Sequence, residues 1–156
     1  MRKTCPRADR SSHIKRPRHR ITPRPGRAHR RYVIFWDVES FVASPFCESE
    51  HRFRLGWLCV RRETTRGKPT YQWVYLDKPD RFWDVLDTMG GKTVWCLAHN
   101  VAYDLWMSGG LEALYRRGYR VTFFYQGGTT TSLRIKKGSR VIIFLDTLNW
   151  FVGALA

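Results

Sequence analysis

The sequence lacks long apolar stretches and closely spaced cysteines. Its longest apolar runs are about five residues, far below the roughly twenty that a membrane-spanning helix needs, so we expect no membrane segment. No apolar segment follows the first basic residues, which argues against a secretory signal. None of the four cysteines forms a C-x-x-C motif. This argues against a structural zinc site and favours an intracellular protein with reduced thiols.

Acidic residues are also scarce, with 13 Asp and Glu against 28 Lys and Arg, for a net charge of +15. Residues 1–31 hold twelve of the basic residues, one acid and four prolines, and almost no aliphatic side chains. Such a segment cannot bury enough apolar surface to fold, so we expect a disordered basic tail. It would bind nucleic-acid backbone through charge, with strong salt dependence. An Arg-rich organelle transit peptide is the alternative interpretation.

The remaining residues, 32–156, are rich in aromatic and β-branched side chains and are long enough for one domain. We predict strands at 32–36, 53–60, 70–76, 92–98, 121–125, 132–137 and 140–145, and helices at 80–89 and 101–119. The simplest arrangement joins the first three strands as antiparallel neighbours, followed by a helix, a strand, a second helix and then further strands. This order predicts an α/β fold with helices packed on a mixed sheet.

Two of these boundaries depend on particular residues. Pro79 is well placed to begin the first helix, and Gly90-Gly91 is expected to end it. The second helix is expected to bend at Gly109-Gly110. Four tryptophans within apolar runs are predicted to lie in the core: Trp36, Trp73, Trp83 and Trp95.

Two acids stand at the end of the first predicted strand, in the sequence YVIFWDVES (32–40). Residues i and i+2 of a strand point to the same face, with Cα atoms about 6.6 Å apart, so Asp37 and Glu39 repel each other unless a cation lies between them. Mg²⁺ is a hard cation that carboxylates bind together with substrate phosphates. The pattern therefore predicts a metal site, although two solvated acids at a strand end would give the same pattern.

A third acid follows a later strand, in LAHNVAYDLW (97–106). Asn100 is suited to cap the helix that begins there, and Asp104 lies one turn further along the same helix face. That helix terminus is able to place Asp104 opposite Asp37, so that three acids surround one or two ions of the kind used in phosphodiester cleavage. The alternative is a capped helix with a surface acid. His99 is a candidate general base, though a histidine beside a helix cap is more often structural.

The last strand also runs directly into an acid, in RVIIFLDTLNWF (140–151). Thr147 supplies a hydroxyl group and Leu148 an apolar side chain, a pair suited to touch a nucleotide. A helix cap at Asp146 or Thr147 explains the pattern equally well. On the strand before it, Arg134, Lys136 and Lys137 would either steer the DNA backbone or protect an exposed strand edge.

Together, FWDVES (35–40), HNVAYD (99–104) and DTLNWF (146–151) resemble the three conserved stretches of a known domain. It is the proofreading 3′→5′ exonuclease domain of family B DNA polymerases, in the protein-primed phage and plasmid branch. The resemblance implies a ribonuclease H-like fold over residues 32–156 and two Mg²⁺ or Mn²⁺ ions. It also implies Asp37, Glu39 and Asp104 as catalytic metal ligands, and contacts to a single-stranded DNA 3′ end from the following residues: Ser40, Asn100, Tyr103, Thr147 and Leu148.

One family motif has no counterpart in this sequence. No Y-x-x-x-D follows Asp146, and in the family that motif supplies a fourth carboxylate and a tyrosine. The acid at the position of Asp146 is not usually a ligand in the family, so it is a poor substitute. We therefore expect an exonuclease domain without its third motif and its C-terminal helix, with the remainder of a polymerase chain as a possible partner.

Two other functions fit the same residues. A non-catalytic module that binds single-stranded nucleic acid would retain the binding residues without a complete metal site. Another nuclease of the ribonuclease H-like superfamily, such as a resolvase or transposase, would use similar strand acids on duplex or branched DNA.

Overall fold

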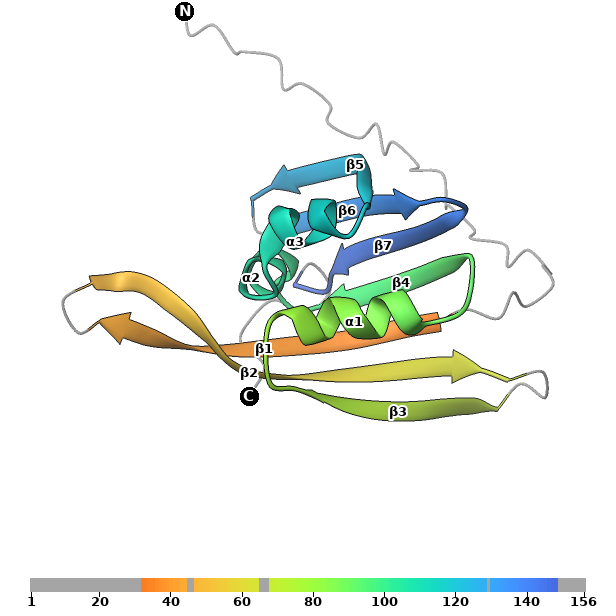
Figure 1. Ribbon diagram of the computed structural model, residues 1–156, viewed down its shortest axis with the longest axis horizontal. Helices are drawn as coiled ribbons and strands as arrows, with labels where there is room; N and C mark the ends of the chain where they lie inside the picture. The colour runs from red at the N-terminus through yellow and green to blue at the C-terminus, as the bar shows by residue number, and fades with distance from the viewer. Residues whose placement is uncertain (1–31, 45–46, 65–67, 129, 149–156) are drawn as a thin grey trace, which may run out of the picture.

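The computed structural model describes residues 32–44, 47–64, 68–128 and 130–148. The expected basic tail lies outside these described residues. The described residues form seven strands and three helices (Figure 1). The strands are β1 (Tyr32–Ser44), β2 (Cys47–Glu63), β3 (Pro69–Leu76), β4 (Thr93–Ala98), β5 (Arg120–Gly127), β6 (Thr130–Lys137) and β7 (Arg140–Asp146). The helices are α1 (Asp80–Thr88), α2 (Val101–Met107) and α3 (Gly110–Arg116).

All seven strands belong to one mixed sheet in the order β3-β2-β1-β4-β7-β6-β5. The central strands β1, β4 and β7 run parallel, and their neighbours on both sides run antiparallel. In the register of this sheet, Phe35 pairs with Leu97, and Ala98 pairs with Asp146. Strands β4 and β7 therefore end level with each other, while β1 continues past them and carries its two acids beyond their ends.

The expected ribonuclease H-like layout is wrong. It required three antiparallel strands followed by strand–helix alternation. The three strands predicted after the second helix, β5, β6 and β7, instead follow one another as antiparallel neighbours and join the same seven-stranded sheet. Strand residues therefore predominate, and the fold is α/β at most. The reason is that Thr131, Leu133 and Ile135 alternate with polar residues and are buried, so this segment gains more by extending the sheet than by adding a helix.

The helices and one face of the sheet share a single apolar core. Side chains that alternate along β1, such as Ile34 and Trp36, point into it, together with Phe144 of β7. Phe82 of α1 stacks on Trp36, with ring centroids 4.9 Å apart. These contacts fix α1 on the sheet face that lies behind the acids of β1. None of the helices in the described ranges is long and apolar enough to cross a membrane.

The predicted helix 101–119 is two helices. The chain breaks at Gly109, whose φ of 90° lies in the left-handed region that favours glycine. The indole N–H of Trp83 donates to the Ser108 carbonyl over 2.6 Å, which ties α1 to this break. The two short helices α2 and α3 are thereby held at the edge of the core, with the N-terminus of α2 beside the end of β4.

Candidate functional site

The two acids of β1 lie on the face of the sheet that points away from the core. Asp37 and Glu39 are exposed. Trp36, which precedes them, and Val38, which lies between them, are buried. The strand is closely paired here: Val38 lies opposite Gly56 of β2, where an added Cβ would lie 2.7 Å from the Val38 side chain and 2.9 Å from the Asp37 carbonyl oxygen. A side chain at 56 would displace this part of β1, so Gly56 helps to fix the acids in place.

Asp104 of α2 contacts the same short segment. The Val38 main-chain N–H donates to Oδ1 of Asp104 over 3.1 Å, although the residues are 66 apart in sequence. Because β4 has already ended, the N–H of Val38 has no strand partner on that side, and the carboxylate takes the place of a neighbouring strand. The structure thus brings Asp104 against the residue between Asp37 and Glu39.

The environment disfavours negative charge at Asp37 and Asp104. Burial raises the pKa of Asp104 to about 8, the hydrogen bond from Val38 lowers it, and the charge of Asp37 raises it again. Burial also raises the pKa of Asp37, with a further rise from Glu39 and an opposing effect of His99. Glu39 therefore raises the pKa of Asp37, and Asp37 raises that of Asp104, as expected for neighbouring acids without a cation between them.

The donor set suits a hard divalent cation, since it consists of carboxylate oxygens that repel one another. Asp37, Glu39 and Asp104 are the residues that would hold such an ion. In the present side-chain arrangement, however, no three His, Cys, Asp or Glu side chains of the described segments lie close enough together to share one ion. The carboxyl group of Asp104 is fixed by its hydrogen bond, so a shared ion requires Asp37 and Glu39 to turn towards it.

Two of the predicted DNA-binding residues form a polar cluster beside these acids. The hydroxyl of Tyr103 donates to Oγ of Ser40 over 2.5 Å, and Nδ1 of His51 lies 2.9 Å from the same oxygen. His51 comes from the β1–β2 hairpin and meets the Tyr103 ring edge-on. Sequence reasoning missed His51, because its place opposite Val42 depends on the hairpin register.

Asn100 has the capping role expected for it. Its side-chain oxygen accepts a hydrogen bond from the Tyr103 N–H over 3.2 Å, at the N-terminus of α2. This bond orients the first turn of the helix, which carries both Tyr103 and Asp104. A side chain used in this way positions its neighbours, and its own contact with nucleic acid stays a prediction.

Asp146 stabilises the turn after β7. One oxygen accepts from the Val101 N–H over 3.2 Å, and the other from the Leu148 N–H over 2.9 Å. The first N–H belongs to the N-terminus of α2 and the second to the chain just after β7, so the acid caps both segments and joins them. Thr147 donates its hydroxyl to the Ala98 carbonyl over 3.1 Å, and Leu148 is partly buried beside it.

A cavity of about 260 Å³ connects these elements. Its lining includes the polar residues Asp37, His99 and Thr147 and the aromatic residues Phe35, Trp57 and Trp73. The sequence motifs included Asp37, His99, Thr147 and Phe35, but not Trp57 and Trp73. Alternation along β1 and β2 would have placed Phe35 and Trp57 on one face, but the pairing of β2 with β3 was needed to bring Trp73 beside them.

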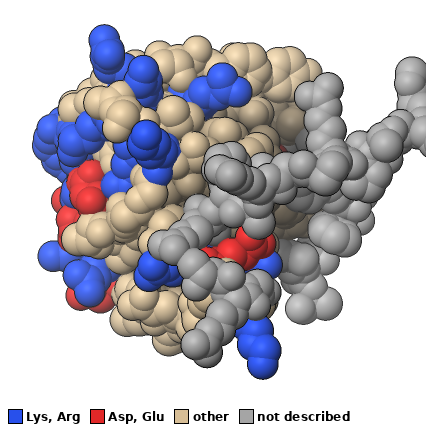
Figure 2. All heavy atoms as spheres, turned by 90° about the vertical axis from the view of Figure 1, so that its right-hand side faces the viewer, with Lys and Arg blue, Asp and Glu red and all other residues tan. Residues whose placement is uncertain are grey.

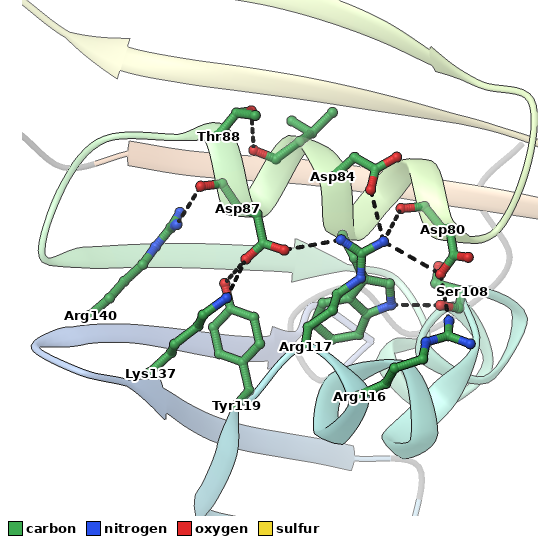
Figure 3. Close-up of polar contacts among 12 residues, drawn as sticks. Asp80, Asp84, Asp87, Thr88, Ser108, Arg116, Arg117, Tyr119, Lys137 and Arg140 are labelled. Atoms are coloured by element: carbon green, nitrogen blue, oxygen red, sulfur yellow. Dashed lines mark hydrogen bonds and ion pairs between the residues drawn. The ribbon is translucent and has the colours of Figure 1, made fainter.

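A second group of acids lies on α1 and is fully paired (Figure 3). Arg117 contacts Asp84 over 2.8 Å and Asp87 over 3.0 Å. Tyr119 and Lys137 donate to the same carboxylate of Asp87. Burial raises the pKa of Asp87, but the hydrogen bonds from Tyr119 and Arg117 and the charge of Lys137 outweigh it and lower the pKa. Lys137 therefore has a structural partner in α1, in addition to the two roles predicted for it, DNA steering and protection of a strand edge.

Basic side chains also surround the end of the molecule where β6 turns into β7. Figure 2 shows this end, with Lys and Arg over much of the described surface and acids among them.

The chain matches no protein-family model, and no match to it is found among the curated proteins or the solved structures. The resemblance to polymerase exonuclease domains stays a prediction.

Proposed function

We propose that the chain is a metal-dependent 3′→5′ exonuclease module that hydrolyses phosphodiester bonds at the ends of single-stranded DNA. The hydrogen bond from Val38 to Asp104 supports this most directly, because it joins the acid of one motif to the acids of another across the fold. The raised pKa values of Asp37 and Asp104 add support, since burial and the charge of a neighbouring acid disfavour the ionised form of each. By its motifs, the module would serve proofreading in a family B polymerase.

The chain's own residues would divide the task. Asp37, Glu39 and Asp104 would hold Mg²⁺ or Mn²⁺, which when bound offsets the charge that develops on the phosphate oxygens. Ser40 and Tyr103 share a hydrogen bond at the edge of the acids, and would orient the terminal nucleotide. The Asn100 cap and the Asp146 cap hold α2 in place, so that these groups keep their spacing during the reaction.

The test is trimming of a 5′-labelled single-stranded oligonucleotide by the full chain in Mn²⁺. We expect a ladder that shortens from the 3′ end, no products in EDTA, and a loss of at least a hundredfold in Asp37→Ala. Asp77→Ala is the matched control, because Asp77 is an exposed acid in the turn after β3, and it should retain full activity. Circular dichroism would show that both variants fold.

Three results would overturn the proposal. Full activity in Asp37→Ala would show that the acids of β1 do not take part. Absence of any divalent-dependent product, with single-strand binding that is the same in Mn²⁺ and in EDTA, would instead identify a non-catalytic binding module. A preference for a branched junction over a single-stranded end would identify a different class of nuclease.

A further inference from the structure

The sheet face opposite the helices carries a group of exposed aromatic side chains. Phe35 is 44% exposed, Trp57 49% and Trp73 67%, and they lie on three adjacent strands. In the register, Asp37 pairs with Trp57, which pairs with Tyr75, while Phe35 pairs with Cys59, which pairs with Trp73. Paired residues point to the same side of a sheet. The aromatic rings therefore form two neighbouring rows, which we term the aromatic platform: Phe35, Trp57, Trp73 and Tyr75.

The platform corrects one prediction from the sequence. Trp36 and Trp83 are buried as expected, but Trp73 is among the most exposed aromatic residues in the described ranges. Its strand, β3, lies at the edge of the sheet, and Trp73 points away from the helices that form the core. Exposure of several large aromatic side chains on one face is unfavourable in water, and such a patch commonly marks a binding surface.

The platform is continuous with the candidate site. Asp37 belongs to the same row as Trp57, and the cavity of about 260 Å³ is lined by Asp37 and Thr147 as well as by platform residues. A flat group stacked on Phe35 or Trp57 would therefore lie beside the proposed metal ligands. The short distance between the platform and Asp37 indicates a ligand with aromatic rings that stack on the platform and with a second group that reaches the proposed metal ligands.

Basic side chains border the same face on the far side of the central strands. Leu133 and Ile135 of β6 are fully buried towards the helices, so Arg134 and Lys136, which alternate with them, project to the opposite face. Arg134 pairs with Ile143 of β7, in the row that continues through β4 to Val33 of β1. Both basic residues are exposed, and no ion pair of the described residues involves either of them.

We infer that single-stranded nucleic acid lies across this face, with its bases stacked on Phe35, Trp57 and Trp73 and its backbone near Arg134 and Lys136. Aromatic side chains bind bases of any sequence, because every base has a stacking face, and a sheet surface with exposed aromatics suits this mode. The stacked strand would deliver its last phosphate to Asp37. This last step rests on the proposed exonuclease function, whereas the stacking does not.

The experiment measures binding by the full chain in EDTA, where metal-dependent cleavage cannot occur. The probes are a fluorescent oligothymidylate of about ten nucleotides and an abasic strand of equal length and charge. Trp73→Ala and Trp57→Ala should each weaken oligothymidylate binding by about tenfold or more, and should leave binding of the abasic strand unchanged. Trp73→Phe, which keeps an aromatic ring, should restore most of the affinity.

Trp106→Ala is the matched control. Trp106 is 75% exposed, but it lies on α2 in a separate groove with Leu105 and Phe124, so its removal should change neither affinity. Equal losses for both probes would overturn the inference, because the contact would then be with the backbone alone. Unchanged affinity in both platform variants would overturn it as well.

A different occupant would also be recognised. If the platform bound a second copy of the chain, Trp57→Ala and Trp73→Ala would convert a dimer to a monomer in sedimentation without changing oligonucleotide affinity, and the inference would be wrong. The proposed exonuclease function fails separately. Retained stacking without metal-dependent trimming would overturn that function alone, and Asp37-dependent trimming without stacking would overturn the platform alone.

Discussion

The acids of α1 and the acids of β1 and α2 are the same kinds of side chain in opposite environments. Asp87 is partly buried, yet its pKa is lowered, because Tyr119, Arg117 and Lys137 donate to it or lie beside it. Asp104 is more deeply buried, and its pKa is raised to about 8. Only the main-chain N–H groups of Val38 and Asn100 favour its charged form, while Asp37 opposes it.

The difference distinguishes a structural cluster from a candidate binding site. In the α1 cluster every carboxylate has a cationic partner, and the group joins α1 to α3 and to the end of β6 (Figure 3). At Asp104 the charges of Asp37 and Asp146 both raise the pKa, so the protein itself does not complete the site. A folded protein retains such repulsion where an external cation or a proton compensates it.

The comparison is tested most strongly by Asp104→Asn. The unfolded chain releases this proton near pH 3.8, and the native state holds it until about pH 8, so the native state binds the extra proton between these values. The stabilisation is present below pH 3.8 and is lost as the pH rises towards 8, with a total on the order of 5 kcal/mol. Urea unfolding in EDTA should therefore show wild-type stability falling over this range, and a flatter profile for Asp104→Asn.

The amide keeps an acceptor for the Val38 N–H, so this variant should fold. Asp77→Asn, at an exposed position, is the control and should follow the wild-type profile. Parallel profiles for the wild type and Asp104→Asn would contradict the buried, unpaired state of Asp104.

The paired cluster should respond to loss of its central cation. Arg117 is mostly buried, with 19% of its side chain exposed, and it contacts three acids of α1. Arg117→Ala leaves Asp84 without a cationic partner and removes one of the partners of Asp80 and Asp87. It should reduce the free energy of unfolding at pH 7 by about 3 kcal/mol. The neighbouring Arg116 has a single ion pair and is 59% exposed, so Arg116→Ala should cost less than about 1 kcal/mol. Equal losses of stability in Arg117→Ala and Arg116→Ala would show that burial of the arginine does not determine how much its ion pairs stabilise the fold.

Divalent ions should distinguish the two groups of acids. If Mg²⁺ or Mn²⁺ binds at Asp37, Glu39 and Asp104, an ion concentration a hundredfold above Kd should raise stability at pH 8 by about 2.7 kcal/mol. The increase should be absent in Asp37→Asn and retained in Asp84→Asn, because Asp84 already pairs with Arg117. If the increase disappears in Asp84→Asn and persists in Asp37→Asn, the ion binds to the acids of α1, and the prediction is wrong.

The sequence predicted individual elements better than their assembly. The continuous apolar run YVIFW (32–36) identified β1, and the Asn100 cap fixed the start of α2, because both signals are local. The position of β7 between β4 and β6 depends on pairing between remote segments, which no local pattern contains. The continuation of β1 and β2 into a hairpin past Ser40 was missed for the same reason.

The candidate site shows the same division. The sequence indicated Asp37, Glu39 and Asp104 by residue type and spacing, and the structure supplied the contact between Val38 and Asp104. Sequence reasoning placed Trp73 in the core, because an aromatic residue in an apolar run reads as buried. The side chain is exposed because β3 is an edge strand without a helix over that face.

The smallest expected effect concerns the link between the motifs at Ser40 and Tyr103. Removal of the hydroxyl in Tyr103→Phe breaks its hydrogen bond to Ser40 and should reduce stability by about 1 kcal/mol. Ser40 keeps its contact with His51, so its oxygen is not left without a partner. A double-mutant cycle with Ser40→Ala should show a coupling energy of similar size. Strictly additive effects would show that the two motifs are near each other without interacting, which would leave Val38 and Asp104 as the contact that joins α2 to β1.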